Sequence, residues 1–265
     1  MQTALHILSL VDELRRELIG GRVVSTEFYK KDRAAYFFVK GPNTRVALGF
    51  LYHPHGHGVF VVPASKIKID TREKPWPIFA LDGVAVTAVD QPALDRLFSI
   101  TFRAGDTEVK VIVEATGANG NLWLLDSGNT VRGTLRKRDF TPGEPYAPPE
   151  PFAGLDPFGL AAEDLASLAE ESPDTGAVML LQKNVVGFNR TLAIEAVHRS
   201  GIDRDDRSPE AWAALARTVR DLAERFRRAD SGYLHTVAGR PEVYPFKLAS
   251  VGEPEEKFKS LSLAA

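Results

Sequence analysis

Hydrophobic residues near the start of the chain recur at three- and four-residue steps, the spacing of an amphipathic helix. They are Leu5, Leu8, Val11, Leu14 and Leu18, and Gly20-Gly21 supplies a stop after them. From Arg22 to about Arg138 the pattern changes to short β-rich runs separated by turn signals. These runs predict strands over 23–29, 35–40, 46–52, 59–63, 84–89, 97–102, 108–113 and 122–125. We expect a β-sandwich over residues 1–140, capped by the first helix.

Prolines then crowd the chain between residues 141 and 159, where neither a helix interior nor a central strand can accommodate them. This segment predicts a linker. The helical period returns over 160–230, with its strongest signal after Ser208-Pro209, a typical N-cap followed by a first-turn proline. Residues 231–265 predict a terminal hairpin and tail. The fold class we expect is therefore α+β, with a sandwich domain, a linker, a helical domain and a hairpin.

Composition adds limits to this picture. The 265 residues are 44% hydrophobic and 26% charged with a formal net charge of -2, so any phosphate-binding surface must be a local patch. Cysteine is absent, which excludes disulfides, thiolate nucleophiles and thiolate zinc sites. The first 16 residues lack the pattern of a signal peptide and no apolar run could cross a bilayer, so we expect a cytoplasmic protein without a membrane partner.

One turn in the helical region carries a recognisable pattern. Residues 180–189, Leu-Leu-Gln-Lys-Asn-Val-Val-Gly-Phe-Asn, and the helix that follows resemble the helix-two-turns-helix module of formamidopyrimidine-DNA glycosylases. The resemblance implies that Gly187 and Asn189 present backbone N–H groups and an amide to a phosphate, with Lys183 and Arg190 beside them. The alternative is that Gly187 shapes a turn and Asn189 caps a helix.

The chemistry of those glycosylases is not expected here. Such enzymes use an N-terminal proline amine and a nearby glutamate, whereas this chain begins Met1-Gln2-Thr3. Their four-cysteine zinc finger is also missing. The sequence therefore predicts a non-catalytic protein with no cofactor.

Several segments in order along the chain resemble the NFACT N-terminal domain, found in fibronectin-binding-protein-A-like proteins and ribosome quality-control factors. The segments are 14–23 (Leu-Arg-Arg-Glu-Leu-Ile-Gly-Gly-Arg-Val), Leu94-Asp95-Arg96-Leu97, 114–126, 142–149 and 258–265. The resemblance implies a glycosylase-like fold used as a platform for RNA, tRNA in particular, and for the large ribosomal subunit. It does not indicate an oligomeric state.

The same resemblance singles out Asp95 and Arg96, because an Asp-Arg pair at this position of the family is implicated in tRNA engagement. An arginine oriented by a carboxylate suits phosphate or base-edge contacts. The alternative is a surface salt bridge at the start of a strand. A second basic cluster, Arg136, Lys137 and Arg138, stands just before the linker and could also meet phosphate.

The chain departs from the family in three ways. Residues 77–84 lack the family's Arg-Lys pair, and Gly117-Ala118-Asn119-Gly120-Asn121 replaces its usual Gly-Arg-x-Ser-Asn, so one arginine is missing. No heptad segment follows, so we expect either a fragment or a diverged stand-alone member. Either case puts full quality-control activity in doubt.

Three of the six histidines, His53, His55 and His57, stand at alternate positions. On one strand their rings would share a face and could hold a divalent metal, whereas Pro54 and Gly56 favour a turn without a metal. We therefore expect no metal site. The function that the sequence favours is RNA or tRNA binding, and the alternatives are a nucleic-acid-processing enzyme or a fibronectin-binding surface protein.

Overall fold

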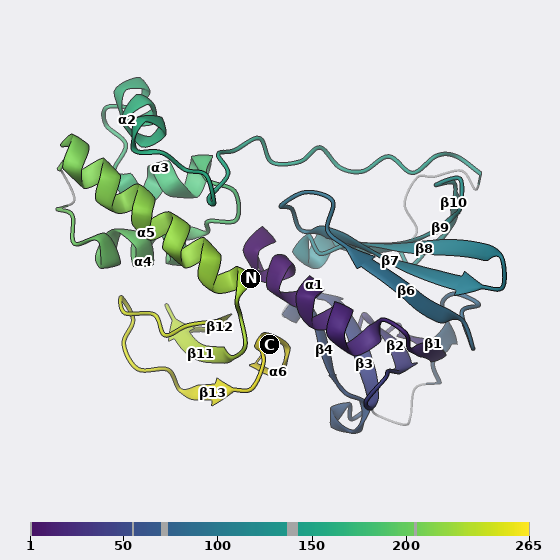
Figure 1. Cartoon of the computed structure of the whole chain (residues 1–265). Helices are drawn as coiled ribbons and strands as arrows, with labels where there is room; N and C mark the ends of the chain where they lie inside the picture. The colour runs from purple at the N-terminus through teal and green to yellow at the C-terminus, as the bar shows by residue number, and fades with distance from the viewer. Residues whose placement is uncertain (1, 55, 70–73, 137–142, 204–205, 265) are drawn as a thin grey trace. The chain divides into compact units, whose positions relative to one another are not determined.

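The computed structural model describes residues 2–54, 56–69, 74–136, 143–203 and 206–264. The chain forms two compact units, shown in Figure 1. The first is built mainly from Leu10–Glu150, and the second from Thr3–Ser9 and Pro151–Ala264. The boundary at residue 150 lies inside the expected linker, and the terminal strands belong to the same unit as the helices. A second boundary lies within helix α1 (Ala4–Leu18), which no sequence signal indicates.

An antiparallel sheet dominates the first unit. Its strands follow the order β10-β9-β8-β7-β6-β1-β2-β3-β4, and β5 pairs with β1. Neighbouring strands are mostly consecutive in the sequence, as short hairpin connections dictate. Their bounds are β1 Arg22–Tyr29, β2 Ala34–Lys40, β3 Arg45–His53, β4 Gly56–Pro63, β5 Trp76–Pro77, β6 Ala85–Asp90, β7 Leu97–Ala104, β8 Thr107–Glu114, β9 Asn121–Asp126 and β10 Val131–Thr134. Two short 3-10 turns, Ala64–Lys66 and Gly117–Asn119, interrupt the connections.

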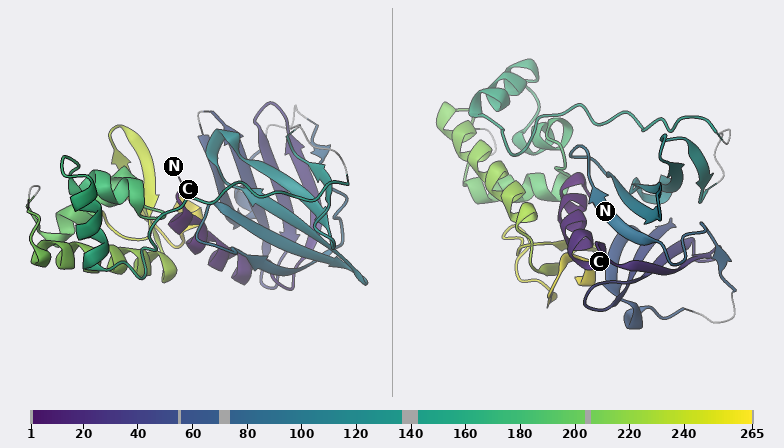
Figure 2. Two further views of the ribbon diagram at one scale, coloured as in Figure 1. Left: turned by 90° about the horizontal axis from the view of Figure 1, so that it is seen from above. Right: turned by 45° about the vertical axis from the view of Figure 1, so that its right-hand side comes forward.

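The expected sandwich is a single sheet whose two halves remain joined. Strands β1 and β6 share one ladder pair, Arg22 opposite Ala85, and the halves diverge from there. Phe37 on β2 nevertheless lies 6.4 Å from Phe102 on β7, ring centroid to ring centroid, so the inner faces of the halves pack on one another. Figure 2 shows the two layers of strands. The core of the first unit therefore lies between them.

The second half of α1 belongs to this unit and borders the seam between its halves. Leu10, Leu14 and Leu18 are buried, as the hydrophobic spacing predicts. The helix ends at Leu18, and Gly20 follows with a φ of +82°, a conformation that suits glycine just after a helix. The amide of Gly20 then donates to the Val86 carbonyl at 3.0 Å, which ties the end of the helix to β6.

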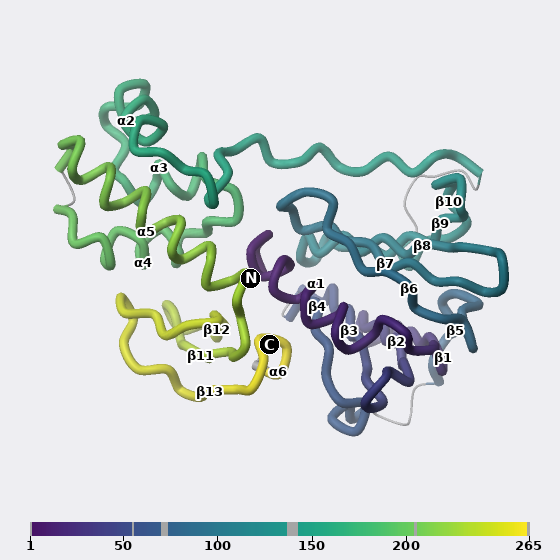
Figure 3. Tube along the Cα trace, viewed as in Figure 1, coloured from purple at the N-terminus to yellow at the C-terminus, as the bar shows by residue number. Residues whose placement is uncertain are grey.

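Residues 143–159, the described part of the proline-rich segment, form no helix and no regular strand, and their trace is extended in Figure 3. Its first part is nevertheless attached to the sheet of the first unit. Tyr146 packs against a cluster that includes Ile112 and Trp123, and its hydroxyl donates to Glu114 Oε1 at 3.0 Å.

The second unit combines helices with a small antiparallel sheet. Four helices follow one another, α2 Ala162–Glu171, α3 Ala177–Asn184, α4 Arg190–Ser200 and α5 Pro209–Arg227. The sheet is formed by β11 (Gly232–Val237), β12 (Arg240–Tyr244) and β13 (Glu256–Phe258), in the order β12-β11-β13. Helix α6 (Leu261–Ala264) follows the sheet in the chain. The expected hairpin is β11 and β12, and β13 was not expected. That the α3–α4 pair corresponds to a helix-two-turns-helix module stays a prediction.

Aromatic rings form the centre of this unit. Phe226 of α5 contacts both Tyr244 and Phe246 edge to face, and His6 from the first turns of α1 lies 4.9 Å from the Phe226 ring. Ser208 caps α5 as expected, because its side chain accepts from the Ala211 amide at 3.2 Å.

Candidate nucleic-acid interface

Asp95 and Arg96 lie immediately before β7, in the first unit. Asp95 Oδ1 accepts a hydrogen bond from the backbone N–H of Arg96 at 2.6 Å, and its carbonyl accepts from the Gln91 amide at 2.6 Å. The carboxylate therefore shapes the turn, and within the described ranges it forms no ion pair with the Arg96 guanidinium. This differs from the expected orientation of the arginine by its neighbour. The side chains of both residues are half-buried.

The backbone of Arg96 is fixed although its guanidinium has no partner among the described residues. The Arg96 carbonyl accepts from the Ala115 amide at 2.7 Å, which joins the start of β7 to the end of β8. Residues 117–120, which we name the glycine loop, follow directly. Arg96 is therefore a charged side chain that the fold positions beside this loop without using its charge.

Arg136 lies on the other side of the glycine loop and is part of the structure. Its guanidinium Nη1 donates to the carbonyls of Ala118 and Gly120 at 2.8 and 3.0 Å. Its Cζ atom also lies 5.0 Å from the centre of the Tyr52 ring, a cation–π contact. Because these contacts use the head of the side chain, Arg136 holds the loop in place and adds positive charge beside it.

A buried asparagine explains how Arg136 reaches this position. Asn121 is fully buried, and its Oδ1 accepts from the Arg136 amide at 2.9 Å while its Nδ2 donates to Thr134 Oγ1 at 2.8 Å. A buried amide that is satisfied on both atoms fixes its neighbours strongly. The sequence pattern showed Asn121 only as a departure from the family motif, and its structural role depends on partners that are distant in the sequence.

His57 packs against the glycine loop from β4. A Cβ atom built on Gly117 would lie 3.1 Å from His57 Nε2, and Gly117 has a φ of +74°, so both the contact and the backbone favour glycine. Burial lowers the pKa of His57, and the nearby positive charge of Arg96 lowers it further. The imidazole is therefore biased towards its neutral form.

Tyr52 lies directly opposite His57 in the β3–β4 ladder. Burial raises the pKa of Tyr52, while Arg136 and Arg33 oppose that shift. The electrostatic influence of Arg33 places a third arginine near this group. We name Arg33, Tyr52, His57, Arg96 and Arg136 the arginine cluster; of these, the sequence predicts only Arg96 and Arg136 as nucleic-acid contacts.

The remaining members of the expected sets have separate positions. Lys137 and Arg138 lie outside the described residues, as does His55. His53 pairs with Gly56 in the hairpin, so His53 and His57 point to opposite faces of the sheet, and the one-face arrangement does not hold for these two. No group of three or more His, Cys, Asp or Glu side chains suited to a metal occurs among the described residues.

The turn between α3 and α4, in the second unit, uses its asparagine internally. Asn189 is the N-cap of α4, because its Oδ1 accepts from the Leu192 amide at 2.9 Å. Its Nδ2 donates to the Tyr244 hydroxyl at 3.2 Å, and that hydroxyl donates to Glu242 Oε2 at 2.6 Å. The Asn189 side chain is therefore committed on both atoms, as the helix-cap alternative predicts.

Gly187 is also explained by packing. Its φ is +78°, and a Cβ atom at this position would lie 2.8 Å from Leu5 Cγ on α1. Lys183 at the end of α3 and Arg190 at the start of α4 are both exposed. The turn thus carries two accessible cations beside a helix N-terminus, whose dipole adds further positive potential.

A buried carboxylate anchors the far end of α4. Glu195 accepts from the amides of Ala249 and Ser250 at 2.8 Å each, from Ser250 Oγ at 2.6 Å and from Arg199 Nε at 2.5 Å. Burial alone would raise the pKa of Glu195, but these hydrogen bonds outweigh burial and lower it. Because every lone-pair direction is occupied within the fold, we assign Glu195 a structural role.

None of the helices within the described ranges combines the length and the apolar composition that a membrane crossing requires.

The comparisons with known proteins concern the whole chain. The family model described as NFACT N-terminal and middle domains matches residues 3–265. A curated relative, the Rqc2 homolog RqcH of Bacillus subtilis (strain 168), is 26% identical over 278 residues, covering 96% of this chain and 46% of the relative. The chain therefore spans about half the length of that protein.

Several solved structures share the fold. The N-terminal part of the fibronectin/fibrinogen-binding protein from Streptococcus suis matches with a TM-score of 0.76 and 19% identity, covering 99% of this chain and 96% of the other. The fibrinogen binding protein from Staphylococcus aureus matches with a TM-score of 0.77 and 18% identity over the same shares of the two chains. With the family model matching nearly every residue, the chain belongs to the NFACT family, in its N-terminal and middle domains.

Proposed function

We propose that this chain is a non-catalytic RNA-binding module that engages tRNA and acts in ribosome-associated quality control, with the large ribosomal subunit as a further partner. The main support for the proposal is that the fold fixes the backbone of Arg96 and leaves its guanidinium available. Its backbone is fixed to Ala115, while no described residue accepts a hydrogen bond from its guanidinium. Membership of the NFACT family supports the same setting, as does the likeness to RqcH.

The arginine cluster suits a polyanion for electrostatic reasons. Arg33, Arg96 and Arg136 form no ion pair with a carboxylate among the described residues, so no direct ion pair neutralises these three charges. A guanidinium presents a planar set of donors that matches phosphate geometry, and positive patches of this kind account for most non-specific affinity for nucleic acids. The small side chains of the glycine loop leave room for a close approach by the ligand.

The turn between α3 and α4 is the second proposed contact. Since Asn189 is occupied on both side-chain atoms, the groups available to a phosphate are the exposed cations Lys183 and Arg190 and the first amides of α4. We also assign Lys137 and Arg138 to the interface on their charge, next to Arg136. Gly187 contributes by allowing the turn and not by touching RNA.

The experiment compares binding of a tRNA and a length-matched DNA duplex across a salt titration. Arg96→Gln should weaken tRNA binding and lower the slope of log affinity against log salt by about 1, because one phosphate contact is lost. Arg45→Gln is the matched control, since Arg45 is exposed at the start of β3 in the same unit. The proposal fails if tRNA binds no tighter than the duplex, or if both substitutions have the same effect.

Sedimentation with purified large ribosomal subunits tests the second partner. The chain should co-sediment in a tRNA-dependent manner if tRNA engagement is its role on the ribosome. Co-sedimentation that is unchanged by Arg96→Gln and by removal of tRNA would show a different mode of attachment.

A further inference from the structure

A hollow lies on the outer face of the first unit, where the two halves of the sheet diverge. Its volume is about 480 Å³, and Arg22, Ala85, Thr87 and Arg103 are among its lining residues. Backbone hydrogen bonds between residues 20–23 and 83–86 join the two strands around the single ladder pair Arg22–Ala85, and the hollow lies beside this short contact. The arginine cluster contributes no residue to this lining.

The register places two arginines in one row across the floor of this hollow. Arg22 on β1 is opposite Ala85 on β6, and Ala85 is opposite Arg103 on β7. Opposite residues of antiparallel strands project from the same face, so the alanine leaves a gap between two long cationic side chains. The two arginines are separated by two strand spacings, roughly 10 Å.

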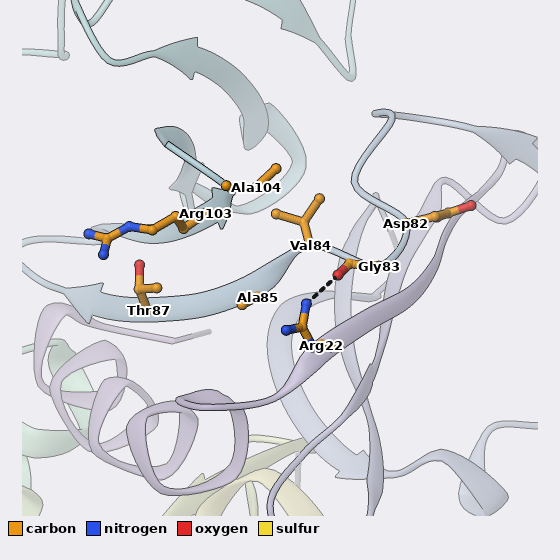
Figure 4. A pocket seen from close by; sticks show the side chains of 9 residues that line it. Arg22, Asp82, Gly83, Val84, Ala85, Thr87, Arg103 and Ala104 are labelled. Atoms are coloured by element: carbon orange, nitrogen blue, oxygen red, sulfur yellow. Dashed lines mark hydrogen bonds between the residues drawn. The ribbon is translucent and has the colours of Figure 1, made fainter. Parts of the chain in front are cut away.

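The side chains around this row favour an anion. The Arg22 guanidinium donates to the Gly83 carbonyl at 3.0 Å, and no described carboxylate forms an ion pair with it. Arg103 extends past Thr87, whose hydroxyl is on the same side, and the Asp82 side chain points away from both arginines (Figure 4). Thr87 lies at a bulge in the β6–β7 ladder, which is typical of positions that re-aim a side chain.

Among the described residues, Arg103 has one competing partner: its Nη2 lies 3.2 Å from Glu108 Oε2. The side chains of this pair are 57% and 42% exposed, so the ion pair is weak and a phosphate can replace it. Both arginines can therefore offer donors to a ligand without a large loss of internal contacts.

We infer that this hollow, which we name the seam groove, binds the phosphate backbone of the RNA strand that the chain engages. The inference rests on the proposed function. The open shape and the two separated guanidinium groups suit consecutive charges along a polymer better than one small anion. The groove adds a contact surface to those that the family resemblance implies.

The test measures tRNA affinity and its salt slope for Arg22→Gln, Arg103→Gln and Ala85→Glu. Each arginine variant should weaken binding roughly threefold to tenfold and lower the slope by about 1. Ala85→Glu should weaken tRNA binding further, because it places a carboxylate between the two arginines. Ion pairs between this carboxylate and the arginines should help the variant to fold. Arg132→Gln is the matched control, because Arg132 is 58% exposed and pairs with Asp126 at 2.6 Å.

The outcomes separate the two proposals. If the unmodified chain binds tRNA and Arg96→Gln weakens it, but the groove variants bind like the control, the seam groove inference is wrong and the proposed function stands. If the unmodified chain does not bind tRNA, both are wrong. Titration with inorganic phosphate is the last arm: saturable binding that Arg22→Gln abolishes, with tRNA binding unchanged, would show a small-anion site and overturn the inference.

Discussion

Replacement of Asn189 separates its role in the fold from a role in RNA binding. Asn189→Ala removes the cap of α4, whose loss costs about 1 kcal/mol in comparable helices. It also removes the hydrogen bond from Nδ2 to the Tyr244 hydroxyl, worth about 1 kcal/mol. We therefore expect the second unit to lose about 2 kcal/mol of its free energy of unfolding.

Urea unfolding followed by far-UV circular dichroism measures this loss. Asn189→Ser keeps a good N-cap but lacks the amide donor, so it should lose only about half as much. Ser208→Ala is the control, because it removes a similar cap from α5, with a loss of about 1 kcal/mol and no expected effect on RNA.

The unfolding measurements are needed to interpret tRNA binding by the Asn189 variants. If Asn189→Ser binds tRNA like the unmodified chain, the side-chain amide makes no contact with phosphate. A loss below about 0.5 kcal/mol in Asn189→Ala would contradict the capping and the tyrosine hydrogen bond described above.

Three further predictions concern Glu195, Gly117 and His6. Glu195→Gln should destabilise the second unit by about 2 kcal/mol or more, because the charge-assisted bonds from Ser250 and its neighbours are weakened; equal urea midpoints would refute this. Gly117→Ala should lower the melting temperature more than Gly83→Ala, since both glycines have positive φ but only the first meets His57. The buried His6 ring, whose Nδ1 accepts from Thr3 while Nε2 donates to Val243, has its pKa lowered to about 4, mainly by burial. In the unfolded chain the ring binds a proton below about pH 6.5. The free energy of unfolding should therefore fall by up to about 3 kcal/mol between pH 7 and pH 4, and His6→Gln should reduce this pH dependence.

Periodicity was sufficient for most helices and strands because their signals are local. The 3-4 spacing around Leu14, the Ser208 cap and the hairpin turns each depend on residues close in the sequence. The continuity of the sheet was not predictable in this way. It depends on the pairing of Arg22 with Ala85, which are distant in the sequence and carry no mutual signal.

The candidate sites show the same limit. Arg96 and Arg136 were singled out from motif and charge, but their convergence on the glycine loop depends on Asn121 and Ala115, which only the fold brings near. For Asn189 the sequence left two interpretations, and the structure shows that its side chain is engaged internally. Charge along the sequence cannot distinguish a cation used by the fold from one left available to a ligand.

Hydrogen exchange with mass spectrometry, with and without tRNA, reports directly on RNA contact at the arginine cluster. We expect tRNA to slow exchange in the peptides that cover residues 94–97 and 114–121, and Arg96→Gln to remove this protection. Unchanged exchange in both peptides at saturating tRNA, or protection confined to other parts of the chain, would contradict an RNA interface at the arginine cluster.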